Sequence, residues 1–248
     1  MAPTELAQRA IREVQEQGFC VLRRHLPGHV IGACRDAFWP RLLAYLQGGH
    51  ASNRGPHRYC LPMPFDRPCF APEVFFDPDL LGVVRGLLGD RIVADQWSCD
   101  VPLRGSTHQA AHVDYQRPLF PEVPALALPA YAIVASFGLI RIAHEHGPIE
   151  IAPGTHCMPK ADALRAVGVG EIPMQAISLE LGDVLIRHPW TLHRGTPNTT
   201  EVPRVLCTIR YVRRWYVDDS RDVNHIPRAT WDSLTPEQQS LMRFPIGT

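Results

Sequence analysis

The sequence has no excess of charge of either sign: 25 basic residues balance 25 acidic ones, for a formal net charge of +0. It also lacks a basic block, because its Arg-Arg pairs at 23–24 and 213–214 are too short to form a patch. We therefore expect no nucleic-acid partner. No apolar run is long enough for a membrane span, and the polar stretch 1–17 lacks the apolar core of a secretory signal. A membrane partner and export are therefore not expected either.

Closely spaced cysteine pairs are missing as well. The chain has 7 cysteines, an odd number, and no two of them form a CxxC pair. Scattered cysteines of this kind are typical of reduced thiols, so we expect a cytoplasmic protein without a cysteine metal site. The cysteines are Cys20, Cys34, Cys60, Cys69, Cys99, Cys157 and Cys207.

The N-terminal region, residues 1–90, predicts mainly helices. Thr4 can cap a helix that ends at Gly18, and a strand follows over 19–22. A second helix is predicted over 30–46 and a third over 80–88. Pro40 is expected to kink the second helix, and the Pro- and Phe-rich stretch 62–72 reads as an ordered loop.

From residue 91 onward the pattern changes to short strands between turns. Strands are predicted at 92–94, 131–137, 149–151, 184–186 and 205–212. The 24 prolines and 18 glycines of the chain suit many tight turns. The pattern predicts a β-sandwich or barrel with flanking helices.

The whole chain, 1–248, is expected to form one domain, because no repeat or low-complexity linker divides it. In this prediction the helical region, residues 1–90, packs on a β core over 91–216. A helical tail over 217–248 follows. With 45% hydrophobic residues, such a chain can bury a sizeable core.

His112 and Asp114 are the first candidate metal ligands. Two residues apart on a strand, their side chains would point to the same face, as two ligands of one metal must. A histidine hydrogen-bonded at a strand edge is the alternative, because a lone HxD triplet arises easily by chance.

His193 follows the predicted strand 184–186 and supplies a third candidate ligand. Two histidines and one carboxylate leave three adjacent positions of an octahedral metal open, which is the arrangement of iron(II) oxygenases. Arg204 comes eleven positions later, at the start of the strand 205–212. A guanidinium there can hold a distant carboxylate with two hydrogen bonds, and the alternative is an exposed arginine at a strand end.

Several segments together resemble the phytanoyl-CoA dioxygenase family of 2-oxoglutarate-dependent oxygenases. They are the triplet 112–114 (HVD), residues 147–156 (GPIEIAPGTH), 182–186 (GDVLI), 193–198 (HRGTPN) and Arg204. Their order and spacing fit from Gly18 to about Tyr216. The spacing from His193 to Arg204 and the turn at 153–156 are the more specific features.

The resemblance implies a double-stranded β-helix, or jelly roll, with iron(II) at one mouth. It implies that His112, Asp114 and His193 bind the iron, and that Arg204 binds the far carboxylate of 2-oxoglutarate. O2 is then the second cosubstrate. Gln109 matches a family glutamine that touches 2-oxoglutarate.

Two departures from the family pattern concern residues near these ligands. Many relatives carry a hydroxyl residue two places after the distal histidine, where this chain has Gly195, with Thr196 beside it as the remaining candidate hydroxyl. Relatives also often have an acidic residue ahead of the Gly-Pro turn, where residues 137–141 read FGLIR. Asp114 is kept, whereas halogenating relatives have a small residue there. This favours hydroxylation, desaturation, epoxidation or cyclisation over chlorination.

Substrate contacts are expected from residues around the mouth of the jelly roll, each of which has a core or surface role as its alternative. These candidates are Tyr59, Arg104, Tyr115, Gln116, Arg117 and Trp190. Among the other histidines, His108 could share a helix face with His112 in a zinc site, but Gly105 nearby disfavours a helix. His188 is a candidate neighbour of the metal ligands, and His144 and His146 read as a polar turn. His156 is not assigned to the metal.

The function expected from all of this is an iron(II)- and 2-oxoglutarate-dependent dioxygenase, most simply a hydroxylase, acting on a small organic molecule as a monomer or homodimer. Succinate and CO2 would be released, and secondary metabolism is one setting. The rival from another class is a metal-binding cupin-like protein without oxygenase activity, such as a sensor or a zinc hydrolase. That alternative has no use for Arg204.

Overall fold

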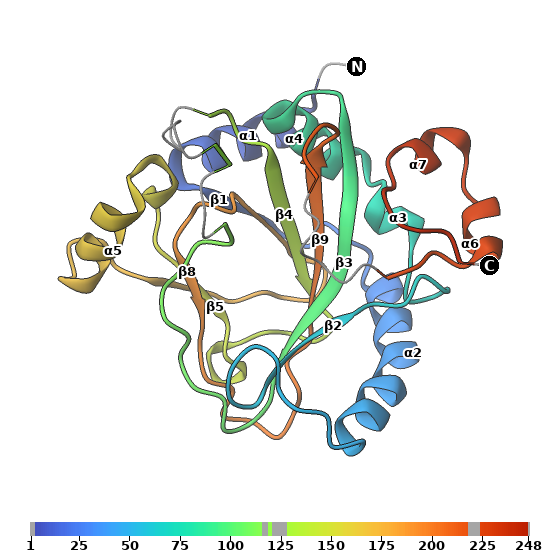
Figure 1. Ribbon diagram of the computed structural model, residues 1–248, viewed down its shortest axis with the longest axis horizontal. Helices are drawn as coiled ribbons and strands as arrows, with labels where there is room; N and C mark the ends of the chain where they lie inside the picture. Colours follow the sequence, from blue (N-terminus) through green and yellow to red (C-terminus); the bar gives the residue numbers. More distant parts are fainter. Residues whose placement is uncertain (1–2, 116–118, 121–127, 218–223, 248) are drawn as a thin grey trace.

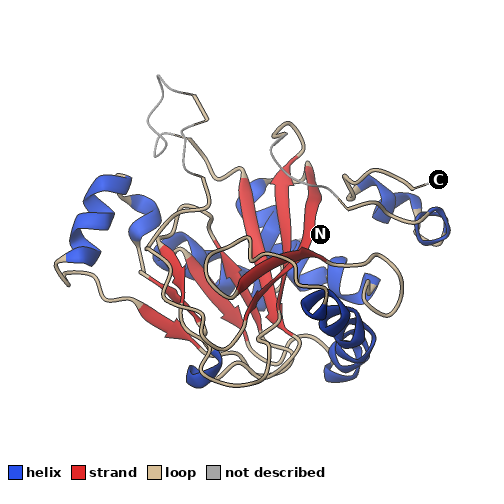
Figure 2. Cartoon of the chain, turned by 60° about the horizontal axis from the view of Figure 1, so that its bottom comes forward, coloured by secondary structure: helices blue, strands red, loops and turns tan. Residues whose placement is uncertain are grey.

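Antiparallel strands form the centre of the computed structural model, which describes residues 3–115, 119–120, 128–217 and 224–247. A six-stranded sheet has the order β1-β7-β4-β9-β3-β2, and a three-stranded sheet has the order β6-β5-β8. Helices lie around these strands (Figure 2). The predicted fold, mainly β with flanking helices, is confirmed, and the two sheets form the expected double-stranded β-helix.

The strands are β1 (Phe19–Leu22), β2 (Arg58–Pro62), β3 (Ile92–Pro102), β4 (Ala132–Gly138), β5 (Ile149–Ile151), β6 (Gln175–Ile177), β7 (Val184–Arg187), β8 (His193–Gly195) and β9 (Leu206–Arg213). The α-helices are α1 (Glu5–Gln17), α2 (Gly28–Gln47), α3 (Pro72–Phe75), α4 (Pro78–Leu88), α5 (Lys160–Gly168), α6 (Arg228–Asp232) and α7 (Pro236–Ser240). Two 3-10 helices are η2 (His144–His146) and η3 (Thr155–Cys157).

The larger sheet has one apolar face and one polar face. On β9, Cys207, Ile209 and Tyr211 belong to the main hydrophobic core, on the face that the sequence predicts. The side chains between them, among them Thr208 and Arg210, line a cavity instead. Because side chains alternate along a strand, the same sheet closes the core on one side and walls a polar cavity on the other.

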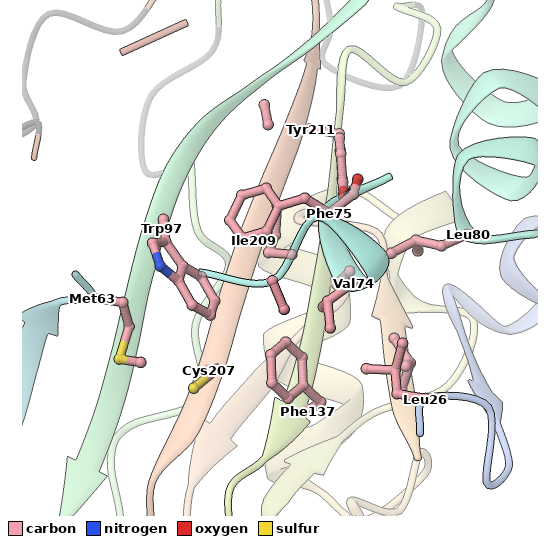
Figure 3. Close-up of a cluster of buried hydrophobic side chains, with 14 of the residues drawn as sticks. Leu26, Met63, Val74, Phe75, Leu80, Trp97, Phe137, Cys207, Ile209 and Tyr211 are labelled. Atoms are coloured by element: carbon pink, nitrogen blue, oxygen red, sulfur yellow. Dashed lines mark hydrogen bonds between the residues drawn. The ribbon is translucent and has the colours of Figure 1, made fainter. Parts of the chain in front are cut away.

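Aromatic side chains fill the core on the apolar face (Figure 3). The ring of Trp97, from β3, lies 5.0 Å from the ring of Phe75 and 6.0 Å from that of Phe137. Its indole Nε1 donates a hydrogen bond to the carbonyl oxygen of Pro64 at 3.0 Å. The single polar atom of this buried side chain is therefore satisfied, and the loop after β2 is tied to the sheet.

Helix α1 begins and ends where the sequence predicts. The Thr4 hydroxyl accepts a hydrogen bond from the backbone N–H of Ala7, and Gly18 ends the helix in the left-handed conformation. Helix α1 packs on α4 at Gly86, where an added Cβ would lie 2.2 Å from Cδ1 of Ile11. A glycine at this position therefore allows the two helices to approach closely (Figure 1).

The structure differs from the sequence prediction mainly in the short elements. Helix α2 runs through Pro40, and the tail consists of α6 and α7 with turns between them. The sequence did not predict β2, β6, β8, α3 or α5. These elements have three to nine residues, which is too few for a clear periodic signal.

One hydrophobic core joins both ends of the described chain, because its members range from Ala7 of α1 to Phe244 after α7. This shared core favours the single domain, which stays a prediction. Among the residues that the structure describes, no helix combines the length and the apolar character needed to cross a membrane.

We predict that Leu80→Ala will destabilise the protein by about 2–5 kcal/mol, because Leu80 of α4 is 1% exposed and its loss leaves a cavity in the core. Leu43→Ala is the matched control, since Leu43 is also helical but 41% exposed. Denaturant unfolding followed by circular dichroism measures both. Equal losses in the two variants would contradict this placement of the core.

Candidate metal centre

A single backbone bridge brings His112 and His193 together. The N–H of His112 donates to the carbonyl oxygen of His193 at 3.0 Å, and the N–H of His193 donates back at 2.9 Å. His193 begins β8, whereas His112 lies in no strand. The prediction that a strand carries the 112–114 triplet is therefore wrong. The pairing with β8 and a hydrogen bond from Asp114 N–H to Pro189 O at 3.0 Å orient the segment instead.

His112, Asp114 and His193 form a group that could hold one metal ion. One ligand atom from each residue lies within 4.8 Å of the other two. Nε2 of His193 is 3.5 Å from Oδ1 of Asp114, and the two imidazole rings are 4.4 Å apart. The His193 side chain is buried, while that of Asp114 keeps 27% of its exposure. The group is thus buried at His193 and accessible to solvent at Asp114.

Backbone carbonyls orient both imidazole rings. Nδ1 of His112 lies 2.8 Å from the carbonyl oxygen of Ala110, and Nδ1 of His193 lies 3.0 Å from that of Thr191. A carbonyl can only accept, so each Nδ1 carries the proton in a neutral ring. Both Nε2 lone pairs are then available to a metal, and the rings are fixed as metal-binding histidines usually are.

Local charges keep this group in the protonation states that a metal needs. Burial alone would raise the pKa of Asp114, but Arg187 and His193 outweigh it and hold the pKa far below its usual range. Burial also lowers the pKa of His112. An ionised carboxylate and a neutral imidazole are the forms that coordinate a divalent cation.

The three residues open onto a cavity of ≈ 200 Å³ between the two sheets. Its wall on the larger sheet includes Gln96 and Asp100 from β3, Ser136 from β4, and Thr208 and Arg210 from β9. All five of these side chains are polar, and Asp100 and Arg210 are ionisable. The cavity therefore suits a polar or anionic small molecule better than an apolar one.

Arg204 lies in this cavity, just ahead of β9, and is 2% exposed. Its Nε and Nη1 are buried and find no hydrogen-bond partner among the described residues. Burial lowers the pKa of Arg204 to about 10, partly opposed by the nearby carboxylate of Asp100. The alternative of an exposed arginine at a strand end is therefore wrong. Leaving buried guanidinium N–H groups unpaired is costly, so this side chain fits an anionic ligand.

The sequence did not point to Arg58, which lies beside Arg204 in the cavity. Its guanidinium donates to the carbonyl oxygens of Thr107 and Thr196, and it is 5% exposed. A Cβ at position 195 would lie only 2.6 Å from Nη1 of Arg58. The missing hydroxyl at Gly195 is thus explained, because an arginine from β2 occupies that space. The unexpected glycine was the one signal in the sequence.

Gln109 lines the cavity next to Gly195. Its Oε1 accepts the backbone N–H of Gly195 at 2.9 Å, and its Nε2 donates to the carbonyl oxygen of Arg54 at 3.3 Å. Both ends of the amide are therefore used to join the 109 segment to β8 and to the loop before β2. A direct contact of Gln109 with a cosubstrate stays a prediction.

The other expected site residues divide into two groups. Tyr59 and Tyr115 line the cavity, and the Tyr115 hydroxyl accepts a hydrogen bond from Nη1 of Arg210 at 3.2 Å. Thr196 and Arg104 do not line it: the Thr196 hydroxyl donates to Pro148 O at 2.6 Å, and Arg104 pairs with exposed Glu201. The structure gives no support to a ligand role for these two.

The remaining candidates lie elsewhere. Trp190 borders a second cavity, although its ring is 6.2 Å from that of Tyr115. Gln116 and Arg117 fall outside the described residues. His108 is exposed in a segment without helix, so the helical zinc site is wrong. His144 and His146 form the short helix η2, close to the expected polar turn.

His188 does not touch the three candidate ligands. Its Nδ1 accepts the backbone N–H of Trp190 at 3.2 Å, and its ring lies 5.3 Å from that of His156. His156 in turn contacts the carbonyl oxygen of Gln15 through Nε2 at 3.1 Å. This histidine pair joins the 156 turn to the end of α1.

A comparison with protein families matches residues 14–206 to the model of phytanoyl-CoA dioxygenase (PhyH). This range covers more than half of the chain and includes His112, Asp114, His193 and Arg204.

Among solved structures, the chain is similar to the non-heme alpha-ketoglutarate-dependent carbocyclase SnoK from nogalamycin biosynthesis, with 18% identity, 89% of this chain and 92% of that chain covered, and a TM-score of 0.64. It is also similar to the epimerase SnoN in complex with Fe3+, alpha-ketoglutarate and nogalamycin RO, with 18% identity, coverage of 98% and 95%, and a TM-score of 0.62. AviO1 from Streptomyces viridochromogenes Tue57 matches with 17% identity, coverage of 87% and 96%, and a TM-score of 0.61. At identities this low, the structural similarity shows a shared fold and nothing more specific.

We predict that His188 makes the protein less stable in mild acid. Burial, together with the nearby charges of His156 and Arg187, lowers its pKa from 6.5 to about 3. Between these two pH values His188 is protonated in the unfolded chain but neutral in the folded chain. The free energy of unfolding therefore falls as pH decreases. The contribution is at most about 1.4 kcal/mol per pH unit.

Urea unfolding of the metal-free protein between pH 7 and pH 4, in steps, measures this effect. The fall in unfolding free energy is expected to be smaller in His188→Gln than in the wild type. His29→Gln is the control, since His29 is exposed at the start of α2. Parallel curves for wild type and His188→Gln would contradict the assignment.

Proposed function

The chain belongs to the phytanoyl-CoA dioxygenase family, and from this premise we propose that it hydroxylates a small organic molecule at a metal centre formed by His112, Asp114 and His193. The family uses iron(II), 2-oxoglutarate and O2, which are therefore the metal and cosubstrates of this enzyme. The observation that carries the assignment of residues is the buried guanidinium of Arg204, whose Nε and Nη1 find no hydrogen-bond partner among the described residues, in the same cavity as the three candidate ligands.

The donor set fits iron(II). Two imidazole nitrogens and one carboxylate oxygen can take three positions of an octahedral ion, and the other three remain for exchangeable ligands. The fixed Nδ1 protons of His112 and His193 present Nε2 to the metal, and Asp114 stays ionised. When bound, iron and 2-oxoglutarate supply oxidation of a C–H bond by O2, with release of succinate and CO2.

Arg204 and Arg58 form the region of the cavity that would bind the far carboxylate of 2-oxoglutarate. Together with Arg54 they surround Asp100, so three cations face one carboxylate. Burial raises the pKa of the Asp100 carboxyl, partly opposed by the positive charges of Arg204 and Arg54. A dicarboxylate would supply the missing negative charge and the acceptors for Arg204.

The other end of the cavity would then bind the organic substrate. Gln96, Ser136, Thr208 and Tyr115 face it with polar groups, and Arg210 forms a two-bond pair with Asp95 at 2.7 and 2.8 Å. A substrate with hydroxyl or carbonyl groups suits this wall better than a plain hydrocarbon.

Hydroxylation is proposed over halogenation because Asp114 occupies a coordination position that a halide would need. SnoK and SnoN, which share the fold, are described as a carbocyclase and an epimerase. Ring closure and epimerisation are therefore the other outcomes that a substrate assay must separate. Mass spectrometry does so, because hydroxylation adds one oxygen atom, ring closure removes two hydrogens, and epimerisation leaves the mass unchanged.

The cupin-like alternative, a metal protein without oxygenase activity, is disfavoured by Arg204. A zinc hydrolase or a sensor needs the metal ligands but gains nothing from an unpaired buried arginine beside them. We also propose a cytoplasmic monomer or homodimer. All seven cysteines are free thiols, which favours a reducing compartment.

We predict that anaerobic addition of iron(II) and 2-oxoglutarate will produce a visible charge-transfer band, and that O2 will then release succinate. His112→Ala should abolish the band, and Arg204→Met should weaken 2-oxoglutarate binding by about 10–100-fold, since a charged hydrogen bond contributes roughly 1.5–3 kcal/mol. Arg141→Met is the control, because Arg141 pairs with Glu180 on the exposed surface. No band in the wild type would rule out the proposed function.

We further predict that Gly195→Ala will weaken 2-oxoglutarate binding by roughly tenfold, which corresponds to about 1.4 kcal/mol. The added Cβ would lie 2.6 Å from Nη1 of Arg58 and 2.8 Å from Oε1 of Gln109, and hydrogen bonds hold both side chains in place. Gly32→Ala is the control, because nothing lies within 4 Å of a Cβ there. Titration of the charge-transfer band with 2-oxoglutarate measures both variants. Unchanged binding in Gly195→Ala would show that the position of Arg58 does not affect 2-oxoglutarate binding.

A further inference from the structure

Arg187, the last residue of β7, contacts two of the three candidate metal ligands. Its Nη2 donates to Oδ2 of Asp114 at 2.9 Å, and its Nη1 lies 3.2 Å from Nδ1 of His193. The side chain is 7% exposed. Nothing in the sequence selects this residue, because neither the ligand spacing nor the family segments draw attention to position 187.

The contact with Asp114 is the one that persists when a metal is bound. A metal at Nε2 of His193 requires the proton at Nδ1, which then donates to the carbonyl oxygen of Thr191. An arginine N–H cannot donate to a nitrogen that already carries a proton. Nη1 is therefore a close neighbour of the ring without a hydrogen bond, while Nη2 keeps its bond to Asp114.

This bond divides the two oxygens of Asp114 between two tasks. Oδ2 is held by Arg187, and Oδ1 lies 3.5 Å from Nε2 of His193, on the side where the histidine lone pairs converge. One oxygen alone then faces the metal. Hydrogen-bonded neighbours that orient a ligand in this way commonly change metal affinity or activity about 10–100-fold.

Arg187 also places a permanent positive charge beside the metal position. A guanidinium stays protonated at any physiological pH, and its burial limits screening by water and salt. A nearby positive charge destabilises a trivalent ion more than a divalent one. Arg210, by comparison, directs its charge to Asp95, which is not a candidate ligand.

We propose that Arg187 is a positioning residue of the metal centre: it reserves Oδ1 of Asp114 for the metal, and its charge favours iron(II) over iron(III). This inference rests on the proposed function, because it takes the three residues as iron ligands. It adds a residue that acts on the metal through Asp114, by a hydrogen bond and by its charge.

The test is a redox titration of the iron-loaded protein without 2-oxoglutarate, followed by the electron paramagnetic resonance signal of high-spin iron(III). Arg187→Met is expected to change the ratio of iron(III) to iron(II) affinity at least tenfold in favour of iron(III), a downward shift of about 59 mV for one electron. Arg187→Lys keeps the charge, so its downward shift in potential should be at most half of that in Arg187→Met.

Arg210→Met is the matched control, since it removes an equally buried arginine from the same cavity and leaves the candidate ligands in place. An equal shift in Arg210→Met, or no shift in Arg187→Met, would overturn the proposal. If Arg187→Met does not fold, Arg187→Gln carries the same prediction. A wild-type protein that binds no iron would instead refute the proposed function itself, so the two failures are distinguishable.

Discussion

Two backbone hydrogen bonds between His112 and His193 hold the candidate metal centre together. Residues that exchange both bonds of an antiparallel pair lie directly opposite each other, and their side chains project to the same side. The two imidazole rings therefore meet although the residues lie far apart in the chain. Asp114 follows because its own N–H is bound to Pro189, just before β8. The His112 segment therefore needs no regular strand to place its two candidate ligands. The bridge to His193 and the hydrogen bond from Asp114 are enough to orient them.

The cavity beyond this bridge contains more buried charge than a stable interior normally accepts. Three arginines of the wall show how such charge is handled. Arg210 forms an ion pair with Asp95, and Arg187 forms one with Asp114. Arg204 has no comparable partner in the described chain, and two of its nitrogens remain without hydrogen bonds. Because an unpaired buried charge is destabilising, an anion bound at Arg204, as proposed, would stabilise the structure. The proposed carboxylate site thus follows from the incomplete hydrogen bonding of Arg204.

Features set by neighbouring residues were predictable from the sequence. Thr4 and Gly18 bound α1, and the alternation along β9 places Cys207, Ile209 and Tyr211 in the core as expected. The jelly roll and the segments around the candidate ligands came from the family resemblance, which the family model confirms. Features that depend on distant contacts were not predictable. β8 has three residues and exists through its pairing with β5, and the strand expected at His112 is absent. Arg187 gave no signal, and Arg58 gave only the indirect one of the unexpected Gly195, because the roles of both follow from which atoms they meet in space.

At Gly195 the sequence departs from the family pattern, and the structure places the side chain of another residue in the same space. On the sequence alone, the glycine departs from the hydroxyl residue of many relatives and leaves open which residues contact the cosubstrate. In the structure, the guanidinium of Arg58 lies where a side chain at 195 would begin, and it reaches this place from β2 on the larger sheet. In the proposed site a charged donor would then stand in for a neutral one, and charged hydrogen bonds are roughly twice as strong. The glycine and the arginine are therefore coupled: a side chain at 195 would displace the guanidinium of Arg58 from its present position.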